Sequence, residues 1–260
     1  MATRVCLESN CETTEFLDHE SEEVREFVRR ALSDADVTPT AKAVKLYYAV
    51  RDGILYEIYG ADLSREGLRA SKVVRTGSGM CIHKSVLYAA ALRAVGIPSR
   101  LVLTDVRNHL SSDRLRKLLG GDVFRHHCLT SVRLDGRWLK ATPVFNKTLC
   151  RLFGITPLEF DGTQDSLHHP FDLHGRRHME FVAVHGEFDD LPYQLIIDGL
   201  KVAHPGLFAG TTVFAGGSLA VDARSSRQYL AGTLKDESYD QRLLDESLAK
   251  LPNLPATQLA

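Results

Sequence analysis

The chain has 260 residues, of which 44% are hydrophobic and 25% are charged, and its formal net charge is −1. This composition is typical of a globular protein with a sizeable core, and the balanced charge argues against a nucleic-acid partner. No apolar run reaches the roughly 18 residues that a membrane span needs. The first residues hold no apolar core of a signal peptide. We therefore expect a cytoplasmic protein without membrane contact.

Five cysteines offer candidate reactive thiols. Their number is odd and their spacing follows no disulfide framework, so in a reducing compartment we expect mostly free thiols. They are Cys6, Cys11, Cys81, Cys128 and Cys150. We expect Cys128 to be a core residue, and Cys6, Cys11 and Cys150 to be structural or surface thiols.

Two helices are predicted before residue 60. The first spans about 21–32, where apolar residues recur at helical spacing. The second opens with Thr38 as its cap and Pro39 in its first turn, a position that proline favours. Residues 60–80 mix polar side chains with glycines, which predicts a loop with room for a short helical turn.

The next helix is predicted from Cys81 to about Val95. Its apolar face is wide and rich in alanine, so it should pack tightly in the core. Gly96 followed by Pro98 is a stop signal for the helix.

The sequence then changes to a strand pattern. SRLVLTDV, at 99–106, predicts a strand, and residues 111–122 predict a small inserted helix. HHCLTSVRLDGRWLKATPVF, at 126–145, predicts a β-hairpin that turns at Asp135-Gly136. A central helix followed by antiparallel strands indicates the α+β class.

The remainder gives weaker signals. Residues 146–178 should be irregular and are rich in histidine, residues 189–203 predict a helix, and Tyr239 to Leu251 predict another. We find no internal repeat and no clear linker, so 1–260 is interpreted as a single domain.

Cys81 is the strongest candidate nucleophile. A thiol must become a thiolate to attack an acyl carbon, and the free N–H groups of a helix N-terminus favour that state. Gly77-Ser78-Gly79 would let a substrate approach, and the same N–H groups could hold an oxyanion. His83 and Lys84 are expected to add positive charge in the same turn.

The base should be a histidine that the fold brings to the thiol. His126 and His127 begin the first strand of the predicted hairpin. Side chains of neighbouring strand residues point to opposite faces, so only one of the two can serve.

TGSGMCIHKSVLYAAALRAVGIPSRLV resembles the nucleophile helix of the transglutaminase-like superfamily. The stretch from His127 through Leu134-Asp135-Gly136-Arg137-Trp138 to Thr142-Pro143 resembles the second half of that family's core. The resemblance covers roughly 40–146 and leaves 147–260 as a C-terminal elaboration. It implies a papain-like fold, with the nucleophile helix packed on an antiparallel sheet.

The resemblance also implies a Cys-His-Asp site without a cofactor. Cys81 matches the nucleophile and His127 the base, but Thr142 occupies the position of the acid. An acid would accept a hydrogen bond from His127 Nδ1–H, and a threonine hydroxyl should support the imidazolium less well. A neutral third member occurs in papain-like enzymes, so activity is not excluded. Other possible acceptors are Asn146, Asp161, Asp165 and Asp172.

A zinc site is the competing interpretation of the histidine-rich segment. Its possible ligands are His168, His169, His174 and His178, with His126 or Cys128 in addition. Their spacing matches no strong zinc motif. We expect no metal, and expect this segment to cover or flank the site.

The predicted function is cysteine-dependent acyl transfer through a Cys81 thioester. Hydrolysis of an amide or peptide is favoured over transamidation, because nothing in the sequence marks a site for an acceptor amine. The substrate would be a peptide, a protein or a small amide. The alternative is a non-catalytic relative that binds a peptide or partner protein, because Thr142 replaces the acid.

Overall fold

The computed structural model describes residues 9–109, 111–168, 173, 176, 178–208 and 218–222. The predicted helix at 239–251, and Cys6, His169, Asp172 and His174, lie outside the described residues. The helices are α1 Glu22–Ala31, α2 Pro39–Gly53, α3 Ala70–Thr76, α4 Cys81–Ala94, α5 Asp113–Leu119, α6 Lys147–Phe153 and α7 Tyr193–Ala203, with 3₁₀ turns at Ser9–Cys11 and Pro205–Phe208. The strands are β1 Leu55–Tyr56, β2 Ser78–Gly79, β3 Ser99–Asn108, β4 Val123–Leu134, β5 Arg137–Ala141 and β6 Met179–Phe188.

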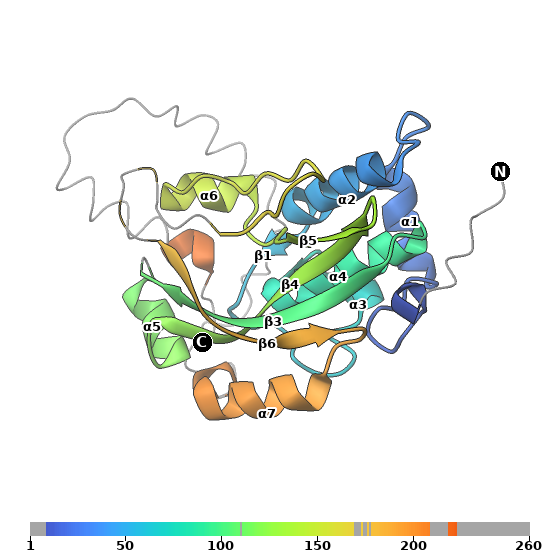
Figure 1. The fold of residues 1–260 in the computed structure, drawn as a ribbon. Coiled ribbons are helices and arrows are strands. Elements are labelled where there is room, and N and C mark those ends of the chain that lie inside the picture. The colour runs from blue at the N-terminus through green and yellow to red at the C-terminus, as the bar shows by residue number, and fades with distance from the viewer. Residues whose placement is uncertain are drawn as a thin grey trace, which may run out of the picture.

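A four-stranded antiparallel sheet organises the molecule, with the order β5-β4-β3-β6. Figure 1 shows α4 behind β3 and β4, with α1, α2 and α3 around it and α7 along the lower edge of the view. β1 and β2 form a separate parallel pair just before α4. The α+β architecture, with one helix packed on an antiparallel sheet, is confirmed.

The capping signals placed the early helices correctly. The side chains of Ser21 and Thr38 accept hydrogen bonds from the third residue beyond them, at the starts of α1 and α2. Pro39 occupies the first turn of α2, where its missing N–H has no cost. The hairpin turns at Asp135-Gly136, where both residues have positive φ, 49° and 80°.

Two elements fall where the sequence did not predict them. The stretch 146–178 was expected to be irregular, yet it begins with α6, whose last turn ends at Gly154 in a left-handed conformation. β6 was not predicted, although it completes the sheet beside β3. Its exposed edge keeps polar side chains among its apolar ones, which weakens the alternation that signals a strand.

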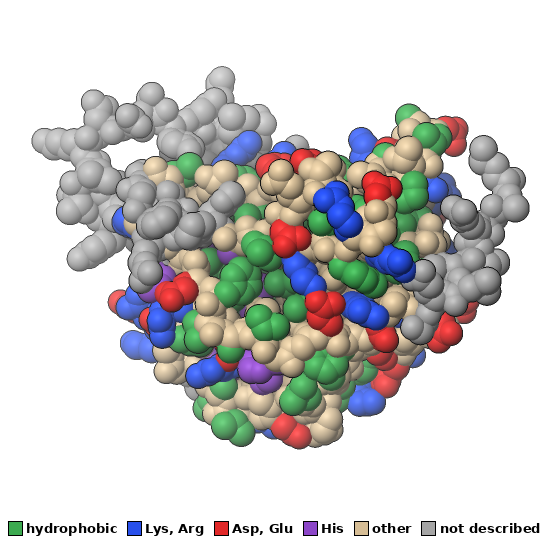
Figure 2. Space-filling view, viewed as in Figure 1, with side chains coloured by type: hydrophobic (Ala, Val, Ile, Leu, Met, Phe, Trp, Pro, Cys, Tyr) green, Lys and Arg blue, Asp and Glu red, His purple; other side chains and the backbone are tan. Residues whose placement is uncertain are grey.

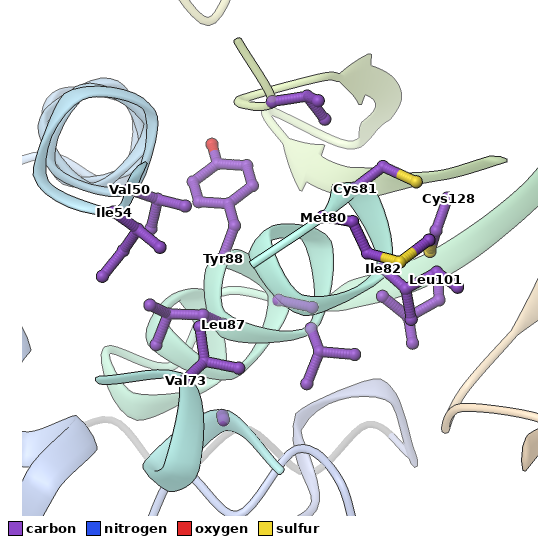
Figure 3. Packing of buried hydrophobic residues seen from close by; sticks show 14 of the residues in the cluster. Val50, Ile54, Val73, Met80, Cys81, Ile82, Leu87, Tyr88, Leu101 and Cys128 are labelled. Carbon is purple, nitrogen blue, oxygen red and sulfur yellow. The ribbon is translucent and has the colours of Figure 1, made fainter. Parts of the chain in front are cut away.

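α4 is buried on all sides, from Cys81 to Arg93. Figure 3 shows Met80, Cys81 and Ile82 at the start of the helix near Cys128, while Tyr88 lies on the side of Val50 in α2 and of Ile54 just beyond α2. A helix that is buried all round lies at the centre of a core. The sequence pattern had indicated burial of one wide apolar face only.

The surface mixes both signs of charge. Figure 2 shows Lys and Arg side chains interspersed with Asp and Glu, and with hydrophobic side chains between them. Among the described residues, no helix is long and apolar enough to cross a membrane.

Cys11 is disulfide-bonded, so the expectation of a free thiol is wrong for this residue. Cys81, Cys128 and Cys150 are free and buried.

Candidate functional site

Cys81 begins α4 and is completely buried. The backbone N–H groups of Cys128, Ile82 and Cys81 itself act on its sulfur and lower the pKa of the thiol. Burial raises the pKa of the thiol to about 12, and the N–H groups offset this only in part. In this structure Cys81 is therefore a neutral thiol, because desolvation of the charged form outweighs the helix N-terminus.

His83 and Lys84, in the first turn of α4, both direct their polar atoms away from the Cys81 thiol. Lys84 is buried and its Nζ donates to the carbonyl oxygens of Arg51 and Ile54, at the end of α2. Burial lowers the pKa of Lys84 to about 7 and also lowers the pKa of His83. His83 Nε2 contacts the carbonyl oxygen of Asp62, 3.0 Å away. The prediction that both side chains supply charge to the thiol is wrong, because each is engaged elsewhere.

Two hydrogen bonds fix α4 to β4 beside the thiol. Ser85 Oγ donates to the carbonyl oxygen of Cys128 (2.9 Å), and Thr130 Oγ1 donates to that of Ser85 (3.1 Å). Since Cys128 follows His127 directly, these bonds hold the first turn of α4 against the part of β4 that carries the candidate base. Among the described residues, no hydrogen bond joins the Cys81 sulfur to His127 itself.

His127 is buried in β4, opposite Thr104 of β3. Burial lowers its pKa to about 4, so the ring is neutral at physiological pH. Its Nε2 lies 3.1 Å from Nε2 of His168, and the two ring centroids are 4.9 Å apart. One imidazole donates and the other accepts, so the two rings cannot both carry a proton on the facing nitrogens.

Thr142 lies just beyond the end of β5 and is completely buried. Its Oγ1 has no hydrogen-bond partner among the described residues. Its carbonyl oxygen accepts a hydrogen bond from Tyr47. The structure thus places Thr142 in the core without a bond to His127.

The other candidate acceptors are occupied elsewhere. Asn146 Oδ1 accepts from the backbone N–H of Tyr56 (3.2 Å). Asp161 accepts from Thr163 within its own turn, and Asp165 accepts from the backbone N–H of Lys140. None of these three bonds involves His127.

The segment that carries His168 is anchored to the core. Ser166 pairs with Ala141 of β5 in an isolated parallel bridge, and its N–H donates to the carbonyl oxygen of Lys140 (2.7 Å). The Tyr47 hydroxyl from α2 lies 3.1 Å from Ser166 Oγ. These bonds fix the chain two residues before His168 and so hold its ring against His127. Sequence reasoning grouped His168 with possible zinc ligands, because nothing local showed that Ser166 joins the sheet.

His126 has different surroundings, although it is the next residue. It has a positive φ of 56° at an irregularity of the β3–β4 pairing, and its ring lies 5.0 Å from that of His185. Asp105, completely buried, accepts from His185 Nε2, Arg125 Nη1 and the backbone N–H of His126. Burial acts to raise the pKa of Asp105, but these bonds prevail and lower it.

No group of three or more metal-ligating side chains is present among the described residues. His169 and His174 are outside that part of the chain, so the zinc interpretation is tested only for the remaining candidates.

A cavity lies beside His127, with Tyr56 in its wall. Tyr56 packs edge-to-face against Phe145, with ring centroids 4.8 Å apart. Its hydroxyl is also close enough to Cys81 to interact with it electrostatically. His127 and Tyr56 therefore border the same cavity, and Tyr56 also lies near the buried thiol.

Residues 26–143 match the family model of the transglutaminase-like superfamily. This segment is a transglutaminase-like core. It includes α4 with Cys81, the β4–β5 hairpin with His127, and the Thr142-Pro143 step, and it begins within α1 rather than at residue 40. His168 lies outside the matched segment.

Several solved structures are similar to part of this chain. The core resembles a "Putative Cysteine Protease" from Cytophaga hutchinsonii (16% identity, TM-score 0.39, covering 51% of this chain and 40% of that one). It also resembles arylamine N-acetyltransferases from Mycobacterium abscessus (16%, 0.37, 52% and 46%) and Salmonella typhimurium (14%, 0.40, 71% and 70%). These structural similarities are too partial to indicate the reaction. No curated protein matches the chain.

Proposed function

We propose that this protein is a cysteine-dependent acyl-transfer enzyme in which Cys81 is the nucleophile and His127 the base. The substrate would be a peptide, a protein or a small amide in the cytoplasm. The proposal favours hydrolysis, with transamidation as the variant reaction in which an amine replaces water.

One observation carries the proposal. The backbone N–H of Cys128, the residue that follows His127, acts on the Cys81 sulfur and lowers the pKa of the thiol. A helix start with convergent N–H groups therefore meets the strand that carries a buried imidazole. Such N–H groups are suited to a developing oxyanion, because they are fixed before the reaction begins.

The charges in the resting structure favour general-base catalysis over a preformed ion pair. Burial holds the Cys81 pKa at about 12 and the His127 pKa at about 4, so both groups are neutral at pH 7. Cys81 Sγ would attack the carbonyl carbon while its proton moves to His127. The imidazolium would return that proton to the leaving amine, and the thioester would then react with water to release the acid.

The contact with His168 fits a His127 tautomer that carries its proton on Nε2, and the proposal takes this tautomer. With Nε2–H donating to His168 Nε2, the unprotonated Nδ1 is the atom that can take the proton from Cys81. In this proposal the orienting bond of His127 is therefore made by Nε2 and not by Nδ1. His168 and Thr142 are then rival orienting residues, and the observed hydrogen bond favours His168.

A second function has its own support. Cys81 is completely buried, and the Thr142 hydroxyl has no partner among the described residues; both features favour a transglutaminase-like domain that binds a peptide or partner protein without cleaving it.

The test is turnover of a peptide and amide library by wild type and Cys81→Ser, with mass spectrometry of acyl adducts. We expect turnover by wild type, an acyl adduct on Cys81, and loss of at least 10³-fold in Cys81→Ser. Activity should stay level between about pH 5 and 8, because His127 is neutral throughout that range.

Cys150→Ser is the matched control, since Cys150 is also a free, buried cysteine. It should retain wild-type turnover. Absence of turnover and of any Cys81 adduct, together with retained peptide binding, would establish the binding function instead.

A further inference from the structure

The cavity beside His127 has a predominantly apolar wall. It lies between α5, α6, and the ends of β3, β4 and β6 that face them. Its apolar lining includes Phe124, Phe145, Leu149, Phe153, Ile155 and Met179.

Five polar side chains in the wall already have partners within the protein. Ser111 Oγ donates to the carbonyl oxygen of Asn108, and Ser112 Oγ donates to Asp222. Asp122 pairs with Arg107 at 3.5 Å. Asn108 and His178 also have interaction partners.

The ring of His127 also borders the cavity, and its Nε2 is hydrogen-bonded to His168. A polar ligand in this cavity would give up its hydrogen bonds to water and find few hydrogen-bond partners in the wall, which costs free energy. An apolar chain has no such hydrogen bonds to give up. Each methylene group that leaves water favours binding by about fourfold.

We propose that this cavity holds the acyl group of the substrate, and that this group is an aliphatic or aryl chain. The inference rests on the proposed function and adds the substrate class to it. The chain would occupy the space between α5 and α6, with its carbonyl end at His127 and Tyr56, on the side of Cys81. Substrates with a short or charged acyl group would be poor.

Leu149 and Leu152 offer a matched pair on α6. Both are buried, but only Leu149 lines the cavity. Leu149→Phe adds bulk inside the cavity, whereas Leu152→Phe adds the same bulk elsewhere in the same helix. A loss of fold would affect both, and circular dichroism of each variant detects it.

The test measures binding apart from turnover, by calorimetry on Cys81→Ser with acetamide, butyramide, hexanamide and octanamide. We expect affinity to rise about fourfold per methylene until the cavity is full. Leu149→Phe in the same background should weaken octanamide binding at least tenfold and leave butyramide within threefold, while Leu152→Phe leaves both within threefold. Equal binding of all four amides, or equal effects of the two phenylalanine variants, would overturn the inference.

The wild-type arm measures kcat/KM for hydrolysis of the same amides. If kcat/KM rises with chain length as the affinity does, the result supports both the acyl-binding cavity and the proposed function. Chain-length-dependent binding without hydrolysis would reject the proposed reaction and retain an apolar ligand site.

Discussion

His126 and His127 are adjacent in β4, yet one lies beside a buried carboxylate and the other beside a second imidazole. Near His126, Asp105 accepts hydrogen bonds from His185 and Arg125. Near His127, the ring partner is His168. Among the described residues, a histidine–carboxylate pair thus forms beside His126, whereas His127 pairs with a second imidazole.

The difference shows which charge states are stable in the buried core. Asp105 keeps its charge because three donors surround it, including the partly exposed Arg125. His127 and His168 are both buried, where an unpaired charge would be costly. Two neutral imidazoles satisfy each other without bringing a charge into the core.

The largest effect is expected from Asp105→Asn. An amide cannot replace all the charge-assisted bonds, so the free energy of unfolding should fall by about 3 kcal/mol. Urea denaturation at pH 7 measures it, with the exposed Asp34→Asn as the control. A change no larger than that of the control would show that the cluster near His126 does not depend on its carboxylate.

His168→Ala should have the next largest effect. It leaves His127 Nε2 buried without a partner, which should cost about 2 kcal/mol of unfolding free energy. Turnover should also fall, because the His127 ring loses the bond that orients it. His168→Gln, whose side chain keeps an acceptor, should restore part of the turnover.

Retained turnover in a folded His168→Ala variant would remove His168 from the mechanism. Equal loss in the Gln and Ala variants would point to packing rather than to a hydrogen bond.

The two neighbourhoods should respond to acid in different pH ranges. The pKa of His127 is lowered by burial from 6.5 to about 4, so between these values the unfolded chain binds a proton that the folded chain does not. Stability from this group is therefore lost as pH falls from 6.5 to about 4. The bonds to Asp105 lower its pKa, so its contribution is lost only as pH falls below 3.8.

Urea midpoints between pH 7 and 3 test this order. His127→Gln should reduce the pH dependence of the urea midpoint between pH 6.5 and about 4. Asp105→Asn should reduce it below pH 3.8. The same slope between pH 6.5 and 4 in wild type and His127→Gln would contradict the assignment.

The smallest effect is expected from Thr142→Val. It removes a buried hydroxyl that has no partner in the described part of the chain, so the free energy of unfolding should rise by about 1 kcal/mol. Turnover should be unchanged if His168 orients His127. A tenfold loss of turnover in a folded Thr142→Val variant would instead assign that role to Thr142.

Local chemistry in the sequence was sufficient for most of the core. Ser21 and Thr38 marked the helix starts, Asp135-Gly136 marked the hairpin, and the small-residue pattern after Cys81 marked α4. Each of these signals acts over a few residues. The family-like segments then brought Cys81 and His127 together as candidates.

Long-range pairing could not be predicted in the same way. His168 reaches His127 because Ser166 pairs with Ala141 and Tyr47 holds Ser166, contacts that no periodicity encodes. The neutral state of Cys81 was missed because the helix N-terminus is visible in the sequence, whereas the depth of burial is not. β6 was missed because it depends on β3 for its hydrogen bonds.

The chemical reactivity of Lys84 would report how fast the core around Cys81 opens. Its ammonium group is enclosed and bound to the carbonyl oxygens of Arg51 and Ile54 at the end of α2. Amine-reactive reagents should modify exposed lysines at once and reach Lys84 only when α2 separates from α4. The rate at which Lys84 is acylated would thus time the opening of the core around Cys81, in native protein and without an engineered label.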